Sequence, residues 1–126
     1  MDGGTARTIV VCREELRVVG YFSLAAGSVE HETAPGALKR NAPDPIPVII
    51  LARMAIAIEE QFKGLGSALL AEAMKRTVKA SSIIGARALI VHALDDRAAN
   101  FYRAHGFRPL SGETYFIPVK AIVRNM

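Results

Sequence analysis

The sequence predicts one mixed α/β domain spanning residues 1–126, with helices flanking a largely antiparallel sheet. A chain of 126 residues suits a single hydrophobic core. Hydrophobic residues make up 51% of it, enough to offset the entropy of ordering the chain, which excludes a disordered or low-complexity protein. Short apolar runs alternate with two helical patterns, in the order strand, strand, loop, strand, helix, strand, helix, strand.

The first two elements form a predicted hairpin. Apolar residues at Thr8–Cys12 predict a strand, a polar turn follows, and Val18–Ala26 predicts its partner. The single cysteine, Cys12, lies in the first run. We expect it to be a small buried hydrophobic residue, and a reactive thiol is the less favoured alternative.

A long loop is predicted from residue 27 to residue 47, where hydrophobic periodicity is lost. Four of the six prolines fall there: Pro35, Pro43, Pro45 and Pro47. Each removes an amide donor and restricts the residue before it. A loop of this length in a small domain is usually functional.

A central strand and a long helix follow this loop. The nearly continuous apolar run Val48–Ile58 predicts a strand covered on both faces. Gly85 is expected to end the helix after it. The apolar stripe of this helix comprises Leu65, Leu69, Leu70, Ala73, Met74 and Val78. The opposite face of the helix carries Glu72, Lys75, Arg76 and Lys79.

The C-terminal third contains a further strand, a short helix and a last strand. Ala88–His92 predicts a buried strand. Asp95 or Asp96 can cap a helix that ends near His105, with Gly106 in the left-handed conformation. The last strand is predicted at residues 114–119, with Pro118 at a sheet edge or a strand end.

No segment resembles a membrane span or an export signal. The most apolar run, Val48–Ile58, contains Arg53 and is shorter than the roughly 20 residues that cross a bilayer. The N-terminus lacks a basic start followed by an apolar core and a cleavage site. We therefore expect a cytoplasmic protein.

Basic residues are concentrated in the second half of the chain. Residues 1–60 carry 6 basic and 8 acidic side chains, whereas residues 61–126 carry 10 and 4. This asymmetry suits a polyanionic partner such as a nucleic acid or a phosphorylated cofactor, and an ordinary solvated surface is the alternative.

The most informative motif joins the central strand to the long helix. It reads Gln61-x-x-Gly64-x-Gly66. Glycines let the backbone approach a ligand, and the unpaired amides and dipole of a helix start favour an anion such as a pyrophosphate. The motif lacks the Gly-Lys-Ser/Thr ending of a Walker loop and the third glycine of the dinucleotide fingerprint. A plain helix start is the alternative interpretation.

Together with two further motifs, this loop resembles the GCN5-related N-acetyltransferase (GNAT) family. The acetyl-CoA loop of that family reads Arg/Gln-x-x-Gly-x-Gly/Ala. Residues 52–56 look like its bulged central strand, and residues 100–107 match its Asn-x-x-Tyr-x-x-x-Gly-Phe signature. The resemblance implies the GNAT fold and acetyl-CoA as the acetyl donor.

Within this family the chain most resembles the toxins of toxin–antitoxin modules that acetylate aminoacyl-tRNA. The specific marks are residues 20–24, 39–48 and 89–96, and the resemblance covers nearly all of residues 8–120. Such relatives carry a few dozen further residues before their second strand, where this chain starts. Ala57 and Phe62 stand where they usually have Asp and Gly.

The resemblance also implies roles for individual residues. Tyr102 is the family's general acid, which protonates the leaving thiolate. Acetyl-CoA is expected to contact Tyr102, Asn100, the backbone of Met54, Ala55 and Ile56, and the loop residues Gln61, Phe62, Lys63, Gly64, Leu65, Gly66 and Ser67. No side chain stands out as general base. The amine of an aminoacyl ester is weakly basic, so a strong base is unnecessary and water could take its proton.

Aminoacyl-tRNA is the expected acceptor, and a ribbon-helix-helix antitoxin the expected protein partner. The candidate RNA contacts are Lys39, Arg40, Arg76, Lys79, Arg87 and Arg97. We expect His92 to be structural and no metal to bind, since no histidine shares a convincing ligand spacing with cysteine or carboxylate. An open sheet edge would favour a homodimer.

Two alternatives remain open from the sequence. One is a GNAT enzyme for a small amine or a protein, which would keep the loop and Tyr102 but need no basic acceptor surface. The other is a truncated, inactive remnant that binds CoA or an antitoxin. The sequence does not identify the amino acid or the tRNA.

Overall fold

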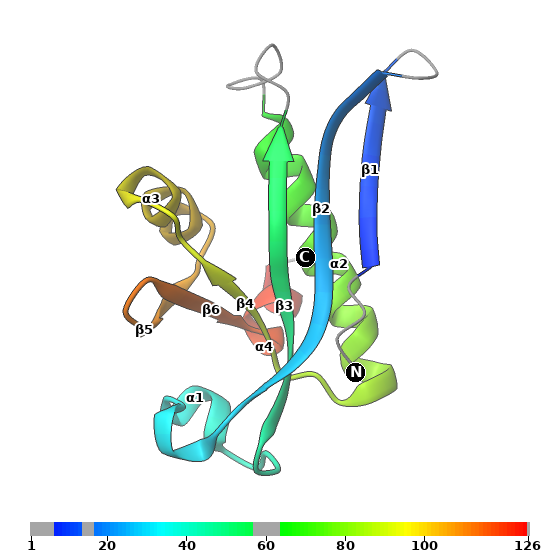
Figure 1. Ribbon diagram of the computed structural model, residues 1–126. Helices are drawn as coiled ribbons and strands as arrows, with labels where there is room; N and C mark the ends of the chain where they lie inside the picture. The colour runs from blue at the N-terminus through cyan, green and yellow to red at the C-terminus, as the bar shows by residue number, and fades with distance from the viewer. Residues whose placement is uncertain (1–6, 14–16, 57–63, 126) are drawn as a thin grey trace.

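The structure is a computed structural model that describes residues 7–13, 17–56 and 64–125. Its elements are shown in Figure 1. The strands are β1 (Arg7–Arg13), β2 (Arg17–Val29), β3 (Ile46–Ile56), β4 (Ala88–His92), β5 (Arg108–Ser111) and β6 (Thr114–Pro118). The helices are α1 (Gly36–Lys39), α2 (Leu65–Ile84), α3 (Asp96–Ala104) and α4 (Val119–Arg124), and η1 (His31–Thr33) is a 3-10 turn.

Six strands form one mixed sheet in the order β1-β2-β3-β4-β6-β5. All neighbouring strands are antiparallel except β3 and β4, which run parallel. The prediction of a largely antiparallel sheet with helices around it is confirmed, and β3 is central as expected.

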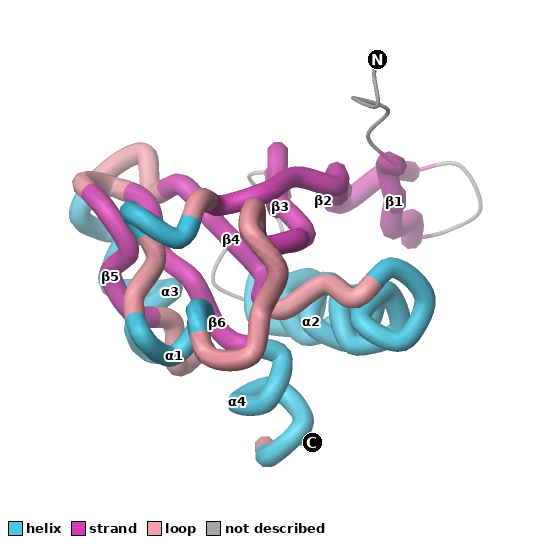
Figure 2. Tube along the Cα trace, turned by 90° about the horizontal axis from the view of Figure 1, so that it is seen from below, coloured by secondary structure: helices cyan, strands magenta, loops and turns pink. Residues whose placement is uncertain are grey.

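Helices cover both faces of this sheet, and α2 lies along one of them (Figure 2). On that face, Leu89 and Val91 of β4 join the main core with residues of α2, α3 and α4. On the other face, Ala88 and Ile90 pack in a smaller cluster with Leu38 of α1. Since both faces of β4 are covered, its sequence is apolar without alternation.

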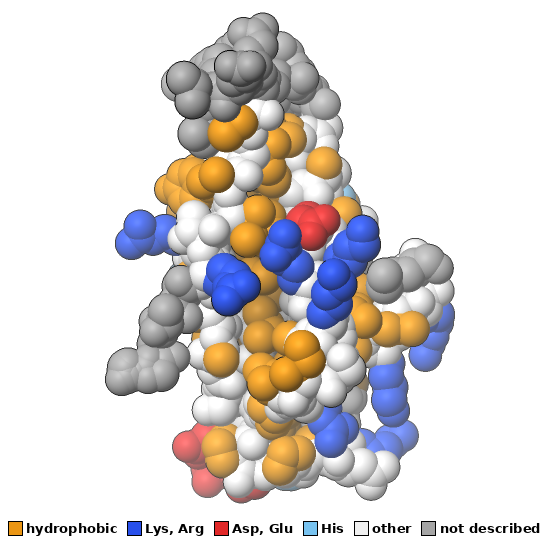
Figure 3. Space-filling view, turned by 90° about the vertical axis from the view of Figure 1, so that its right-hand side faces the viewer, with side chains coloured by type: hydrophobic (Ala, Val, Ile, Leu, Met, Phe, Trp, Pro, Cys, Tyr) orange, Lys and Arg blue, Asp and Glu red, His pale blue; other side chains and the backbone are white. Residues whose placement is uncertain are grey.

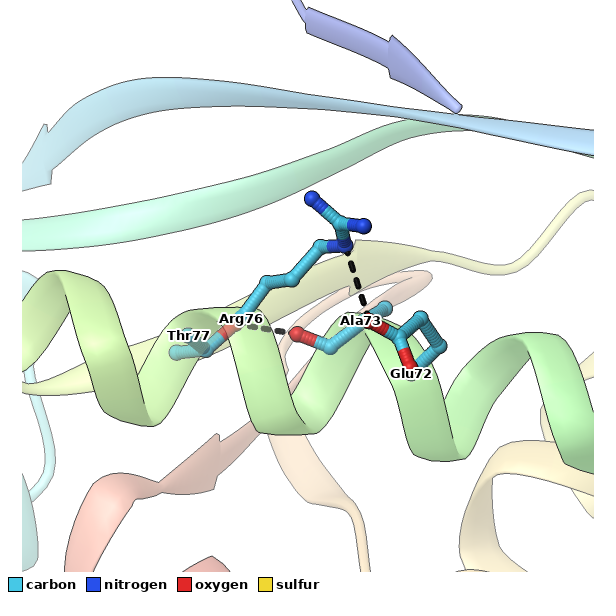
Figure 4. A network of polar contacts seen from close by, with 4 residues as sticks. All are labelled: Glu72, Ala73, Arg76 and Thr77. Atoms are coloured by element: carbon cyan, nitrogen blue, oxygen red, sulfur yellow. Dashed lines mark hydrogen bonds and ion pairs between the residues drawn. The ribbon is translucent and has the colours of Figure 1, made fainter. Parts of the chain in front are cut away.

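The amphipathic pattern of α2 is confirmed. Leu69, Leu70 and Ala73 are buried against the sheet. Thr77 is also fully buried, and its hydroxyl donates a 2.8 Å hydrogen bond to the carbonyl of Ala73, which satisfies the one buried polar group of this stripe (Figure 4). Gly85, with φ of 74°, ends the helix as predicted.

The prediction of a single long loop between residues 27 and 47 is wrong. β2 continues to Val29, β3 starts at Ile46, and η1 and α1 lie between them. Pro35 is the N-cap of α1, where its missing amide costs nothing, and Leu38 is buried beneath the sheet. The prolines therefore delimit short elements within the segment.

The C-terminal segment contains two elements that the sequence did not predict. Residues 108–111 form the edge strand β5, and residues from Val119 onward form α4 rather than extending the last strand. Pro118 ends β6. Its position at a strand end is as predicted, although β6 itself lies inside the sheet.

Cys12 is exposed, so the prediction of a buried cysteine is wrong. β1 forms one edge of the described sheet, and alternate side chains point to opposite faces. Ile9 and Val11 pack against the main core, which leaves Val10 and Cys12 on the exposed face. Of the helices in the described ranges, none is both long and apolar enough to span a bilayer.

Candidate active site

The central feature of the candidate site is the open edge of β3 beyond Leu51. β3 pairs with β4 only from Ile49 to Leu51, and the two strands then diverge (Figure 1). Within the described residues, no strand pairs with this side of β3 from residue 52 to residue 56. Its backbone amide and carbonyl groups can therefore pair with an extended ligand, as a further strand would.

A β-bulge lies at the start of this open edge. Ser23 of β2 is opposite Arg53, whereas Leu24 is opposite Leu51, so Ala52 is the extra residue. A bulge bends the strand and redirects the groups that follow it. Met54 is half-buried and Ala55 is exposed, so the expectation that both faces of β3 are covered holds only for its first half.

The start of α2 supplies unpaired amides. Gly64 is its N-cap in the left-handed conformation, with φ of 83°, and no side chain caps the first turn. Because residues other than glycine are strained at this φ, the position favours glycine even though a Cβ there would meet no atom within 4 Å. Gln61, Phe62 and Lys63 lie outside the described residues, as does Ala57.

Tyr102 is held by the C-terminal cap of α3. The amide of Phe107 donates to the carbonyl of Tyr102 at 3.1 Å, and that of Gly106 to the carbonyl of Arg103 at 3.0 Å. With Gly106 at φ of 93°, this is a Schellman motif. The rings of Tyr102 and Phe107 pack with centroids 5.5 Å apart, which is the hydrophobic contact that accompanies the motif.

The side chain of Tyr102 is buried, and its hydroxyl has no partner among the described residues. The residue is only 8% exposed, and burial raises the pKa of its phenol above the usual 10.0. In the described part of the chain no residue hydrogen bonds to this hydroxyl, and no buried polar side-chain atom lacks a partner. The ring is therefore packed while the hydroxyl keeps access to solvent.

Asn100 and Ser67 lie at the exposed surfaces of α3 and α2. The side-chain oxygen of Asn100 accepts a 3.3 Å hydrogen bond from Arg103. Ser67, in the first turn of α2, contacts Nε2 of His105 at 3.1 Å. His105 is the C-cap of α3, so this contact joins the helix of Tyr102 to the start of α2.

The six candidate RNA contacts fall on different parts of the molecule. Arg76 and Lys79 line a groove between α2 and the first two strands, and Arg76 is paired with Glu72 at 3.0 Å. Arg40 and Arg87 line a separate hollow beside the C-terminal end of α2. Lys39 is exposed on α1, and Arg97 is exposed on α3 and has a partner.

Sequence reasoning missed several residues that the structure brings together. Arg108, Lys120 and Arg124 join Arg40 and Arg87 around the hollow. The only signal was the excess of basic residues after position 60, because the two elements that carry these three side chains were not predicted. The contact of His105 with Ser67 could not be predicted from the sequence, where His105 is visible only as the residue before the capping Gly106.

The other histidines make local contacts. His31 places Nε2 at 2.8 Å from the carbonyl of Pro43, and Nδ1 of His92 lies 3.4 Å from the hydroxyl of Thr114. Among the described residues, no group of three or more histidine, cysteine or carboxylate side chains could hold a metal ion.

Comparison with known proteins gives a consistent result. Residues 5–109 match the family model of the acetyltransferase (GNAT) domain. A tRNA-acetylating toxin of Mycobacterium tuberculosis (strain ATCC 25618 / H37Rv) is 54% identical over 99 residues. This match covers 79% of the chain but only 59% of that toxin, so the chain spans less than two thirds of its length.

Two solved structures resemble the chain over nearly its whole length. AtaT complexed with acetyl-methionyl-tRNAfMet is 33% identical, with a TM-score of 0.87, and the match covers 95% of this chain and 75% of that one. A tyrosine-to-phenylalanine variant of the AtaT toxin, bound to the C-terminus of the antitoxin AtaR and to acetyl-CoA, is 34% identical with a TM-score of 0.80. Its match covers 95% and 72% of the two chains.

Proposed function

Because the chain belongs to the GNAT acetyltransferase family, we propose that it transfers the acetyl group of acetyl-CoA to the amino group of an aminoacyl-tRNA. The observation that carries the proposal is the open edge of β3 after the bulge at Ala52, together with the accessible hydroxyl of the buried Tyr102. A strand edge can hold an extended thioester arm, and a phenol can protonate its leaving sulfur.

Acetyl-CoA would bind along β3 and at the start of α2. The backbone of Met54, Ala55 and Ile56 would pair with the pantetheine amides, with Asn100 as a further contact. The uncapped amides after Gly64 would face the pyrophosphate, whose negative charge the helix dipole favours. The loop contributes Gln61, Phe62, Lys63, Gly64, Leu65, Gly66 and Ser67.

The reaction is the attack of a neutral amine on the thioester carbonyl. A C–N bond forms, the C–S bond breaks, and the amine releases one proton to water. Backbone amides of β3 stabilise the negative charge that develops on the carbonyl oxygen. Tyr102 gives its proton to the departing thiolate and is reprotonated from solvent.

The pKa of Tyr102 keeps the proton on the phenol until the thiolate leaves. A free thiol has a pKa near 8.5, below the usual value for a tyrosine. Since burial raises the phenol pKa further, Tyr102 is fully protonated at neutral pH and the donor is always available. Because the phenol is a weaker acid than the thiol, its proton transfer to the thiolate is uphill, and reprotonation of the phenoxide from solvent completes it.

Support for a charged tRNA as acceptor comes from charge and from the relatives. Residues 61–126 carry 10 basic and 4 acidic side chains, which suits a polyanion. The M. tuberculosis relative is a tRNA-acetylating toxin, and AtaT was solved with an acetylated aminoacyl-tRNA. An acetylated amino group cannot accept a peptide, so the product would block translation.

Partners and location follow from the same reasoning. The complex of AtaT with AtaR supports an antitoxin as partner, and we expect one of the ribbon-helix-helix class. β1 is an edge strand of the described sheet, and a second copy that covers it would give a homodimer. A protein that acts on tRNA is expected in the cytoplasm.

The proposal is tested by following labelled acetyl groups. Purified protein should move label from acetyl-CoA onto charged tRNA and not onto the same tRNA without its amino acid, and expression should arrest growth. Label on a small amine or a protein instead would favour a GNAT enzyme of another substrate class. CoA binding without any transfer would favour a remnant that binds CoA or an antitoxin.

A further inference from the structure

A basic hollow lies at the end of the molecule opposite the candidate active site. It has a volume of about 750 Å³ and is bounded by α1, the C-terminal end of α2, and α4 with the end of β6. Figure 2 looks onto this end of the molecule, where α1 and α4 are both in view.

Five cationic side chains line this hollow: Arg40, Arg87, Arg108, Lys120 and Arg124. None of the described residues that line it is acidic. In the described ranges, the side chains of Arg40, Lys120 and Arg124 form no ion pair or hydrogen bond. Their charge is unbalanced, and apolar walls such as Leu38 and Val119 strengthen its field.

Two of these cations are already ordered. The guanidinium of Arg87 donates a 3.0 Å hydrogen bond to the carbonyl of Asn41. That of Arg108 lies over the ring of Phe116, 5.3 Å from its centroid. Each contact leaves other N–H donors of the guanidinium available, so less side-chain entropy is lost when an anion binds.

We propose that this basic hollow binds backbone phosphates of the tRNA, and the proposal rests on the proposed function. Arginine presents paired donors that match phosphate geometry, and lysine adds a point charge. Five cations drawn from four separate segments of the chain suit several phosphates in a row rather than one small anion. The hollow would hold the RNA while the charged 3′ end reaches the thioester.

The distance along β4 fits this arrangement. Arg87 directly precedes β4, and the strand ends at His92, shortly before the helix that carries Tyr102. Five residues of strand span about 16 Å. A few nucleotides of single-stranded RNA can bridge that length, so one tRNA can contact both places.

A protein segment is the less suitable occupant, because five cations and no acidic side chain line this hollow. The molecule carries an apolar stripe on the side shown in Figure 3, where hydrophobic side chains run between lysines and arginines. The groove there has a volume of about 300 Å³ and is lined by Ile9, Leu24 and Ile83.

The test compares two double variants of the full chain by filter binding to uncharged tRNA over a range of salt concentrations. Lys120→Ala with Arg124→Ala removes two exposed cations of α4 from the hollow. Arg7→Ala with Lys75→Ala removes two exposed cations that lie outside the hollow and is the matched control. Circular dichroism checks folding, and Arg40→Ala, on a different element, replaces the first variant if it is unfolded.

We expect the α4 variant to lose about tenfold or more in affinity, and its salt slope to fall by about 2, while the control changes little. Equal losses in both variants, or none in either, would overturn the proposal. The proposal would also be overturned if the α4 variant kept its tRNA affinity but no longer bound an acidic peptide such as polyglutamate. The hollow would then be a site for an acidic protein segment. Because uncharged tRNA is the probe, absence of acetyl transfer would refute the proposed function without affecting this result.

Discussion

Nε2 of His105 lies 3.1 Å from the hydroxyl oxygen of Ser67, and this contact joins the end of α3 to the first turn of α2. The other ring nitrogen, Nδ1, lies 2.8 Å from the carbonyl oxygen of Phe101, which can only accept a hydrogen bond. Nδ1 therefore carries the proton, and in the neutral ring Nε2 accepts from the Ser67 hydroxyl. The contact fixes the helix of Tyr102 relative to the proposed pyrophosphate site.

A double-mutant cycle should detect this coupling. His105→Phe keeps the ring against Phe101, where the centroids are 4.6 Å apart, but removes both hydrogen bonds. Combined with Ser67→Ala, it should show a coupling energy of about 0.5–1.5 kcal/mol in the free energy of unfolding, measured by urea denaturation. Calorimetry should show weaker CoA binding in both single variants. Strictly additive effects would mean that the two helices are not coupled through this pair.

Tyr102→Phe should lower turnover and leave CoA binding unchanged. The variant removes only the hydroxyl and keeps the ring packing against Phe107. Loss of a general acid lowers kcat by about a hundredfold to ten-thousandfold. Steady-state kinetics with charged tRNA and calorimetry with CoA measure the two quantities. A variant with full turnover would show that Tyr102 has only a packing role.

The same variant should alter stability at alkaline pH. Burial raises the pKa of Tyr102 above 10.0, so the folded state binds this proton more tightly than the unfolded state does. The stability that results is complete below the unfolded pKa and is lost as pH rises through the folded pKa. Between about pH 8 and about pH 11, urea denaturation should therefore show a larger loss of stability in the wild type than in Tyr102→Phe. Equal losses would place the phenol in a solvent-like environment.

Most of the sheet could be predicted from the sequence, because its strands are short apolar runs separated by polar or glycine-containing turns. α1 and β5 could not. α1 has four residues, too few for helical periodicity, and it is stabilised by burying Leu38 under the sheet. β5 contains Pro109 and has no buried residue, so it is a strand because β6 offers it an unpaired edge.

The candidate site was predictable only where a backbone conformation requires a particular residue. Gly64 and Gly106 have positive φ, and both were visible in the sequence as glycines next to a helix. The open edge of β3 and the basic hollow depend on where distant segments pack. Arg40 and Arg108 are 68 positions apart, and no local pattern places them around one cavity.

Gly64→Ala should destabilise the start of α2. The residue has φ of 83°, so an alanine there is strained by about 1–2 kcal/mol although its Cβ would meet no atom within 4 Å. Gly36→Ala is the matched control, since that site is also open but has no positive φ. Urea denaturation should show a loss of stability for the first variant and a small gain or no change for the second. Equal effects would refute backbone strain at Gly64.

Asp95→Ala should release the N-terminus of the helix that carries Tyr102. The carboxylate of Asp95 accepts a 2.8 Å hydrogen bond from the amide of Ala98, as the N-cap of α3. Loss of such a cap costs about 0.5–2 kcal/mol. Hydrogen exchange should become faster in the first turn of α3, and turnover should fall without a change in CoA affinity.

Asp96→Ala controls for the loss of charge in this experiment. Asp96 is also exposed and lies in the first turn of α3, but it is not the N-cap. Removing it weakens only the interaction with the helix dipole, so the cost should be about 0.3–1 kcal/mol and hydrogen exchange should change little. If the two variants were equally destabilised, the effect would be one of charge. A larger effect of Asp95→Ala would instead mean that the capping hydrogen bond stabilises the start of α3.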